Sequence, residues 1–192
     1  MIEQPAPIDA DEVGTQGFER LLRTVEELDT PDGFKAELIR GKIVVSPWSK
    51  LRYLRPMRAL RRQLEEHAPE GHIADSTPFL FSFPVAERAY GPDLFVVEEA
   101  AFDAEGRHAD AEALSLVAEF TSVSTKDSDW HEKLGVYGQL VPVYLVVDMQ
   151  AREITCFSDP SPGGYRSRWT VSFGEPLRVP GPFDCEIDTT AF

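Results

Sequence analysis

Apolar residues recur with helical spacing in three segments of the chain. In residues 18–28 they fall at i, i+3, i+4, i+7 and i+10, which predicts an amphipathic helix that the Thr-Pro-Asp-Gly of residues 30–33 ends. A second helix is predicted from about Pro56 to residues 67–69, and a third over residues 127–140. Each helix has an apolar stripe on one side, so each should pack against a sheet or another helix.

Shorter apolar runs predict strands. Residues 35–46 predict a hairpin that turns at Arg40-Gly41, and residues 154–158 and 165–173 predict a second hairpin. The other predicted strands are residues 79–83, 94–97, 114–120 and 143–147, whereas the acidic residues 98–112 should form a solvated loop. Together these elements predict an α/β (α+β) fold in which helices flank a mixed central β-sheet.

The length and composition are those of one globular domain. The 192 residues are enough for a substantial core, and 42% of them are hydrophobic. We expect a flexible acidic tail over residues 1–15 and a single domain over residues 16–192. The amino-terminal residues lack the apolar stretch of a signal peptide, and no apolar run approaches the roughly 20 residues that span a membrane. Cys156 and Cys185 have no zinc or CxxC spacing. A cytoplasmic protein without membrane contact is therefore expected.

The charge of the chain is strongly negative but uneven. The net charge is −14, which as a whole opposes binding to a polyanion. Residues 43–63 contain six bases and no acid, so the rest of the chain carries −20. Arg55, Arg58 and Arg62 lie at i, i+3 and i+7 and are the best candidates for contact with nucleic-acid phosphates. The same basic segment is equally compatible with a solvated helix face or an acidic partner.

Three acids lie in or beside segments that should be dry strands: Glu37, Asp93 and Glu119. A carboxylate among Leu, Ile, Val and Phe is costly unless a partner offsets its charge. Three carboxylates together repel, so that at least one would take up a proton. A divalent cation such as Mg²⁺ or Mn²⁺ removes this repulsion, because hard cations prefer oxygen ligands. Each acid taken alone could instead face solvent at a strand end.

The order of two of these acids resembles the PD-(D/E)xK nucleases, in which an Asp after Pro is followed by a Glu on an apolar strand. Those nucleases have a lysine two residues after the glutamate, where this chain has Thr121. Lys133 is the candidate replacement, since a lysine on the following helix can reach a carboxylate at a strand end. Asp129 precedes it by four residues, a spacing that joins side chains on a helix. Without the resemblance, the simpler interpretation is that Lys133 lies on the surface and forms an ion pair with Asp129.

Five stretches in order make the resemblance more specific. The chain is similar to the Uma-two family of restriction endonucleases, a branch of the PD-(D/E)xK fold with a migrated lysine. The match covers roughly residues 18 to 190. The stretches are ELIRGKIVVSP, GPDLFVV, EFTSVSTKDSDWHEKLGVY, VPVYLVVD and GGYR, which begin at residues 37, 91, 119, 141 and 163. The chain departs from the family at Val123 and at Leu140. It also departs near residues 48–56, a region in which the family often carries a His.

The resemblance implies a restriction-endonuclease-like core and metal-dependent hydrolysis of phosphodiester bonds, with DNA as the expected substrate. Asp93 and Glu119 would bind Mg²⁺ or Mn²⁺, and Glu37 would complete the ligand shell. Lys133 would act with Asp93 and Glu119 in catalysis, and Asp129 would support it. Proteins of this type commonly work as homodimers, which we expect here as well. The alternative is a catalytically silent module for binding or assembly on the same fold, and uptake of a divalent cation separates the two.

Overall fold

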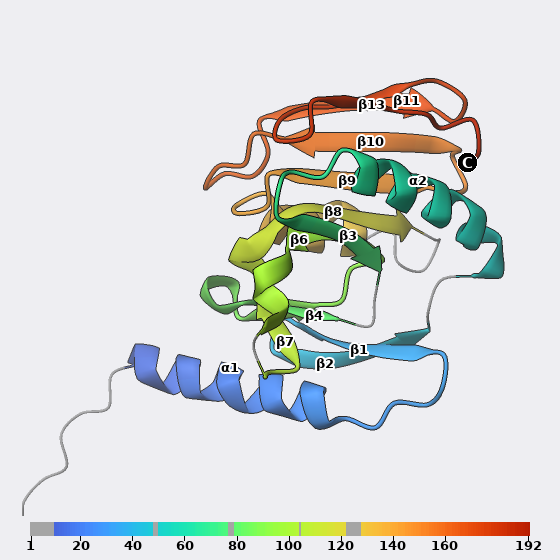
Figure 1. Ribbon diagram of the computed structural model, residues 1–192. Helices are drawn as coiled ribbons and strands as arrows, with labels where there is room; N and C mark the ends of the chain where they lie inside the picture. Colours follow the sequence, from blue (N-terminus) through green and yellow to red (C-terminus); the bar gives the residue numbers. More distant parts are fainter. Residues whose placement is uncertain (1–9, 48–49, 77–78, 104, 122–127) are drawn as a thin grey trace, which may run out of the picture.

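Two β-sheets lie face to face in the centre of the molecule, and helices cover their outer faces (Figure 1). The computed structural model describes residues 10–47, 50–76, 79–103, 105–121 and 128–192, with side chains from residue 16 onwards. In this part of the chain, one sheet has the order β2 (Lys42–Pro47), β1 (Phe34–Ile39), β5 (Arg88–Tyr90), β4 (Leu80–Phe83) and β7 (His108–Asp110). The other has the order β11 (Ser167–Ser172), β10 (Glu153–Ser158), β9 (Val143–Asp148), β8 (Leu114–Thr121), β6 (Leu94–Glu98) and β3 (His72–Ser76). We call them the small and the large sheet.

Both sheets are mixed, which confirms the predicted fold class. The pairs β8/β9 and β4/β7 are parallel, and the neighbouring pairs β6/β8 and β9/β10 are antiparallel. β8 and β9 lie in the middle of the large sheet and are buried along their whole length. Their nearly uninterrupted apolar sequences fit this position, because a strand covered on both faces needs apolar residues on both.

Alternation along the strands separates three layers of core. α1 (Ala10–Glu27) covers the outer face of the small sheet through Phe18 and Leu22, which pack with Leu38 of β1. α2 (Leu54–Glu66) covers the outer face of the large sheet through Leu60 and Leu64. The third layer fills the space between the two sheets and is rich in aromatic rings. It contains Phe81, Tyr90, Phe95, Val117, Tyr137, Tyr144 and Phe157.

The carboxyl-terminal residues extend the outer layer of the large sheet. β12 (Leu177–Val179) and β13 (Cys185–Ile187) form a two-stranded sheet that packs with the same core as α2. Cys156 and Cys185 are both buried free thiols. None of the helices in the described ranges is long and apolar enough to cross a membrane.

Several elements differ from the sequence predictions. α1 begins at Ala10, so residues 10–15 of the expected tail are helical. The helix predicted over residues 127–140 is a π-helix, Ser128–Lys133, followed by the short α3, Leu134–Tyr137. The acidic segment expected to be a loop contains the strand β7 and the 3₁₀ turn Glu99–Asp103. A strand of three residues is too short to show a period of two, which is why β5 and β7 were missed.

Candidate active site

The turn Gly91-Pro92-Asp93 carries the chain from β5 of the small sheet to β6 of the large sheet. The antiparallel register pairs Leu94 with Ala118, which brings Asp93 opposite Glu119 on β8. The backbone N–H of Phe120 donates to Asp93 Oδ2 at 2.9 Å and fixes that carboxylate at the strand end. Asp93 and Glu119 share the face of Phe95 and Val117, which is turned toward the small sheet.

Two residues of β1 face them from the small sheet. Lys35 and Glu37 are two positions apart on one strand, so their side chains point to the same side. Glu37 Oε1 accepts a hydrogen bond from the N–H of Gly91 at 3.0 Å. The Lys35 ammonium donates to the carbonyl oxygen of Gly91 at 2.6 Å and lies 3.5 Å from Asp93 Oδ1. The turn between the sheets is therefore bound to β1 through both polar groups of one glycine.

Lys133 enters the same space from the π-helix. Its ammonium lies 2.8 Å from Glu119 Oε1 and 3.1 Å from Glu37 Oε1, so that it bridges the two sheets. Asp129 Oδ1 is 3.8 Å from the same ammonium, at the predicted i, i+4 spacing. The side chain of Lys133 is only 4% exposed, so this lysine belongs to the interior and not to a surface pair. A π-helical turn widens the backbone locally and is frequent at functional sites.

A shell of tyrosines surrounds these charges. The Tyr137 hydroxyl donates to Glu119 Oε1 at 3.2 Å, and the Tyr144 hydroxyl donates to the backbone oxygen of Asp129 at 3.0 Å. The ammonium of Lys133 lies 5.6 Å from the centre of the Tyr90 ring. These rings exclude water from the charges and strengthen the interactions among them.

Burial and mutual attraction set the protonation of the cluster. Burial raises the pKa of Glu119 to about 8, although Lys133 and Lys35 act in the opposite direction. Burial acts on Glu37 in the same way, but Lys133, Lys35 and the N–H of Gly91 together hold its pKa below the ordinary value. For Lys133 itself, the attraction of the nearby carboxylates outweighs burial and raises the pKa well above that of an ordinary lysine. The lysine is charged, and Glu119 takes up a proton more readily than Glu37.

All five residues that the sequence singled out for the site or its support lie in this cluster. We call Lys35, Glu37, Asp93, Glu119, Asp129 and Lys133 the interior charge cluster. Sequence reasoning missed Lys35 and the hydroxyl of Tyr137. The signal for Lys35 was its place two residues before Glu37 in a strand, which puts both side chains on one face. The Ser and Thr of the motif after Glu119 lie in residues 122–127, outside the described part of the chain.

The three arginines predicted to contact nucleic acid lie away from the interior charge cluster. α2 packs on the face of the large sheet that carries Leu94, Leu116 and Ala118, opposite the face of the interior charge cluster. The exposed side chains of Arg55, Arg58 and Arg62 therefore lie across the sheet from it, around a shallow hollow of about 650 Å³. Their contact with nucleic acid stays a prediction, and it would have to involve a part of the substrate away from the cluster.

Comparison with known proteins shows the family and the fold of the chain. The model of the Uma2 family, described as "Putative restriction endonuclease", matches residues 18–190, and the chain belongs to this family. A crystal structure from Anabaena variabilis, titled a "putative nuclease belonging to DUF820", superposes with a TM-score of 0.68 at 12% sequence identity. The match covers 90% of this chain and 94% of that one, so the two share a fold. No curated protein matches the chain.

The donor set of the cluster fits a divalent cation by its chemistry, but it is not arranged as a finished ligand shell. The cluster contains four carboxylates and two ammonium groups, which leaves two negative charges when all are ionised. Hard carboxylate oxygens are the ligands that Mg²⁺ and Mn²⁺ prefer. Among the described residues, no three His, Cys, Asp or Glu side chains converge on one metal position. Instead, the ammonium of Lys133 lies between Glu37 and Glu119.

Proposed function

We propose that this protein is a metal-dependent endonuclease that hydrolyses phosphodiester bonds of nucleic acid, with DNA as the substrate. Membership in the Uma2 family supports nuclease chemistry in general. The observation that carries the proposal is the meeting of Glu37, Asp93, Glu119 and Lys133 at one buried place from four segments of the chain. A protein that needed only stability would gain little from a buried charge cluster, because desolvation offsets most of the attraction.

Asp93 and Glu119 are the residues that would hold Mg²⁺ or Mn²⁺, with Glu37 as the third ligand. Among the described residues, the hydrogen bonds to the Glu119 carboxylate end on Oε1, so Oε2 is the atom we assign to the metal. Asp93 contributes a carboxylate whose Oδ2 accepts the N–H of Phe120 and whose Oδ1 lies 3.5 Å from the ammonium of Lys35. When bound, the metal would lower the pKa of a water molecule and stabilise negative charge on the phosphate.

The two lysines have separate tasks in this proposal. The ammonium of Lys133 has three hydrogens to donate. A water or phosphate oxygen would replace one of its carboxylate partners, and the ammonium would then place its positive charge beside the reacting atoms. Lys35 is the most exposed residue of the interior charge cluster. Its side chain is 12% accessible, against 10% for Asp93 and 3–5% for Glu37, Glu119, Asp129 and Lys133. It would bind a phosphate oxygen where the substrate enters. Asp129 keeps the ammonium of Lys133 in place and makes no contact with substrate.

The test is nicking of supercoiled plasmid at low salt with Mg²⁺ or Mn²⁺. We expect nicking by the wild-type protein and its loss in Asp93→Asn, in Lys133→Met and in EDTA. Lys42→Met is the matched control, because Lys42 is an exposed lysine on β2 and should nick at the wild-type rate. Equal nicking by Asp93→Asn and the wild type would contradict the assignment of the site.

Calorimetric titration with Mn²⁺ separates the enzyme from the alternative of a silent binding or assembly module. Uptake of the metal that is lost in Asp93→Asn supports the nuclease, whereas a folded protein that takes up none supports the module. The homodimer stays a prediction, which analytical ultracentrifugation checks directly.

A further inference from the structure

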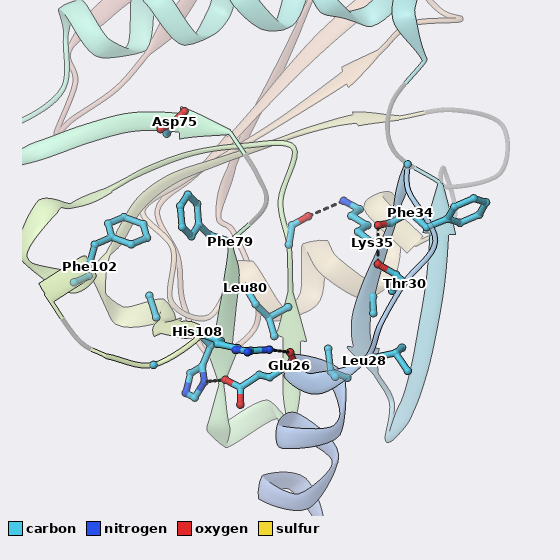
Figure 2. Close-up of a pocket in the computed structure, with 18 of the residues that line it drawn as sticks. Glu26, Leu28, Thr30, Phe34, Lys35, Asp75, Phe79, Leu80, Phe102 and His108 are labelled. Carbon is cyan, nitrogen blue, oxygen red and sulfur yellow. Dashed lines mark hydrogen bonds and ion pairs between the residues drawn. The ribbon is translucent and has the colours of Figure 1, made fainter.

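A cleft of about 960 Å³ opens beside the interior charge cluster (Figure 2). It lies where the carboxyl end of α1 and the start of β1 approach β3, β7 and the 3₁₀ turn Glu99–Asp103. Its volume is at the upper end of the range of small-molecule sites, about 300–1,000 Å³. Of the residues that line this cleft, the function proposed above uses only Lys35.

Aromatic rings stand on both sides of the cleft. Phe79 and Phe102 lie together on one side, with ring centres 4.9 Å apart in an edge-on arrangement, and Phe34 and Lys35 lie on the other (Figure 2). Phe79 is 41% exposed and Phe34 is 40% exposed. Exposed aromatic rings are the side chains on which unpaired nucleobases stack.

The cleft joins the interior charge cluster at one end. Lys35 and Gly91 line it, and Lys35 also contacts Asp93. The two regions are close in the backbone as well, since a Cβ on Gly91 would lie 3.4 Å from the carbonyl oxygen of Phe79. Asp93 and Lys35 are the more exposed members of the cluster, with 10% and 12% of their side chains accessible. The open side of the cluster therefore faces the cleft.

The charge of the cleft lining favours a nucleobase over a phosphate group as the occupant. The acids that line the cleft are Glu26, Asp32, Asp75, Glu99 and Asp103. Arg107 donates to the backbone oxygen of Glu26, and His108 contacts the carboxylate of Glu26. These two basic side chains of the lining are therefore already engaged. Lys35 places positive charge at the end next to the cluster. A phosphate fits that end only, whereas carboxylates elsewhere can accept hydrogens from the amino group of a base.

We propose that this cleft holds an unpaired nucleobase of the nucleotide next to the reacting phosphate, stacked on Phe79. The inference rests on the proposed nuclease function and narrows its substrate to single-stranded or locally unpaired nucleic acid. A base inside an intact duplex cannot reach the ring, because its faces are covered by neighbouring bases.

The test compares two labelled 12-mers in Ca²⁺: oligodeoxyadenylate, and a strand of the same length with abasic tetrahydrofuran residues throughout. We expect the wild-type protein to bind the adenylate strand about ten-fold more tightly, the size expected for stacking of one base. Phe79→Ala should weaken binding of the adenylate strand about ten-fold and leave the abasic strand unchanged. Phe79→Tyr, which keeps the ring, should restore the difference.

Phe173→Ala is the matched control, because this partly buried ring packs on Phe192 and does not line the cleft. Thermal unfolding of each variant checks that it is folded, and Phe79→Leu replaces Phe79→Ala if the smaller side chain lowers stability. Equal binding of both strands by the wild type, or an equal loss for both in Phe79→Ala, overturns the cleft assignment. Plasmid nicking together with equal binding refutes the cleft alone. Absence of both nicking and binding refutes the proposed function as well.

Discussion

Replacement of Lys133 by Met tests whether its ammonium holds the two sheets together. The substitution keeps a chain of similar length but removes the charge that lies 2.8 Å from Glu119 and 3.1 Å from Glu37. Removal of one partner from a buried ion pair costs about 3–5 kcal/mol, because the remaining charge is buried without compensation. For a chain of this size, 1 kcal/mol corresponds to about 2–4 °C in Tm. We therefore expect Tm at pH 8 to fall by roughly 6–20 °C.

The pH dependence of this loss has a definite sign. An acid whose pKa is higher in the folded state stabilises the fold at low pH and loses this contribution as pH rises through its folded pKa. For Glu119 in the wild type this decline falls between 4.5, its ordinary pKa, and about 8. Lys133 is the main influence that lowers the pKa of both Glu119 and Glu37. Without it both values rise, so the variant should lose stability more steeply than the wild type from pH 5 to pH 9.

The assay is urea denaturation at pH 5, 7 and 9 without metal, followed by circular dichroism. Lys42→Met serves as the control, since this exposed lysine should cost little. The double variant Lys133→Met/Glu119→Gln should recover much of the loss at pH 9, because the amide carries no charge to bury. A loss below about 1 kcal/mol that does not change with pH would refute the reasoning, since that is the range of an exposed pair.

Three further predictions concern substitutions whose outcomes thermal unfolding and nuclease assays can check. Gly138→Ala should destabilise the fold, because the new Cβ would lie 2.9 Å from a backbone oxygen and 3.0 Å from the backbone near Gly164. Gly135→Ala, whose Cβ would have no atom within 4 Å, should be neutral or slightly stabilising. Equal Tm values for the two variants would contradict this. Leu60→Ala should cost about 2–5 kcal/mol, since Leu60 is fully buried between α2 and the large sheet, and a cost below 1 kcal/mol would be inconsistent with that packing. Lys35→Met should raise KM for plasmid more than it lowers kcat if this lysine binds substrate at the entrance, and a loss in kcat alone would place it in the chemical step.

The hydrophobic pattern was sufficient for the elements with many apolar contacts. β8, β9 and α2 carry long apolar runs or stripes, and the structure has them where the sequence predicted them. The pattern could not distinguish the π-helix at Ser128–Lys133 from an α-helix, because both place apolar residues on one side over a single turn. It also missed β5 and β7, which both pair with β4 and whose three residues each are too few to show a period of two.

The site was partly predictable for a related reason. Acids in dry segments drew attention to Glu37, Asp93 and Glu119 because a buried carboxylate is costly wherever it lies. Their meeting point was not contained in local sequence, since it depends on a turn that passes between two sheets. Lys35 was overlooked because a lysine at the start of a strand is usually solvated. Its contacts with Gly91 and Asp93 distinguish it from such a lysine.

The hydrogen bonds of Gly91 give the interior charge cluster a built-in reporter of local opening. Its N–H is bound to Glu37 across 54 residues of chain, so this amide exchanges its hydrogen with solvent only when the turn leaves β1 or the whole protein unfolds. Most amides of β8 and β9 are held inside one sheet and report on that sheet alone. Slower exchange at Gly91 on addition of metal, with unchanged rates in β9, would mean that the ligand closes a hinge between the sheets without stiffening either one.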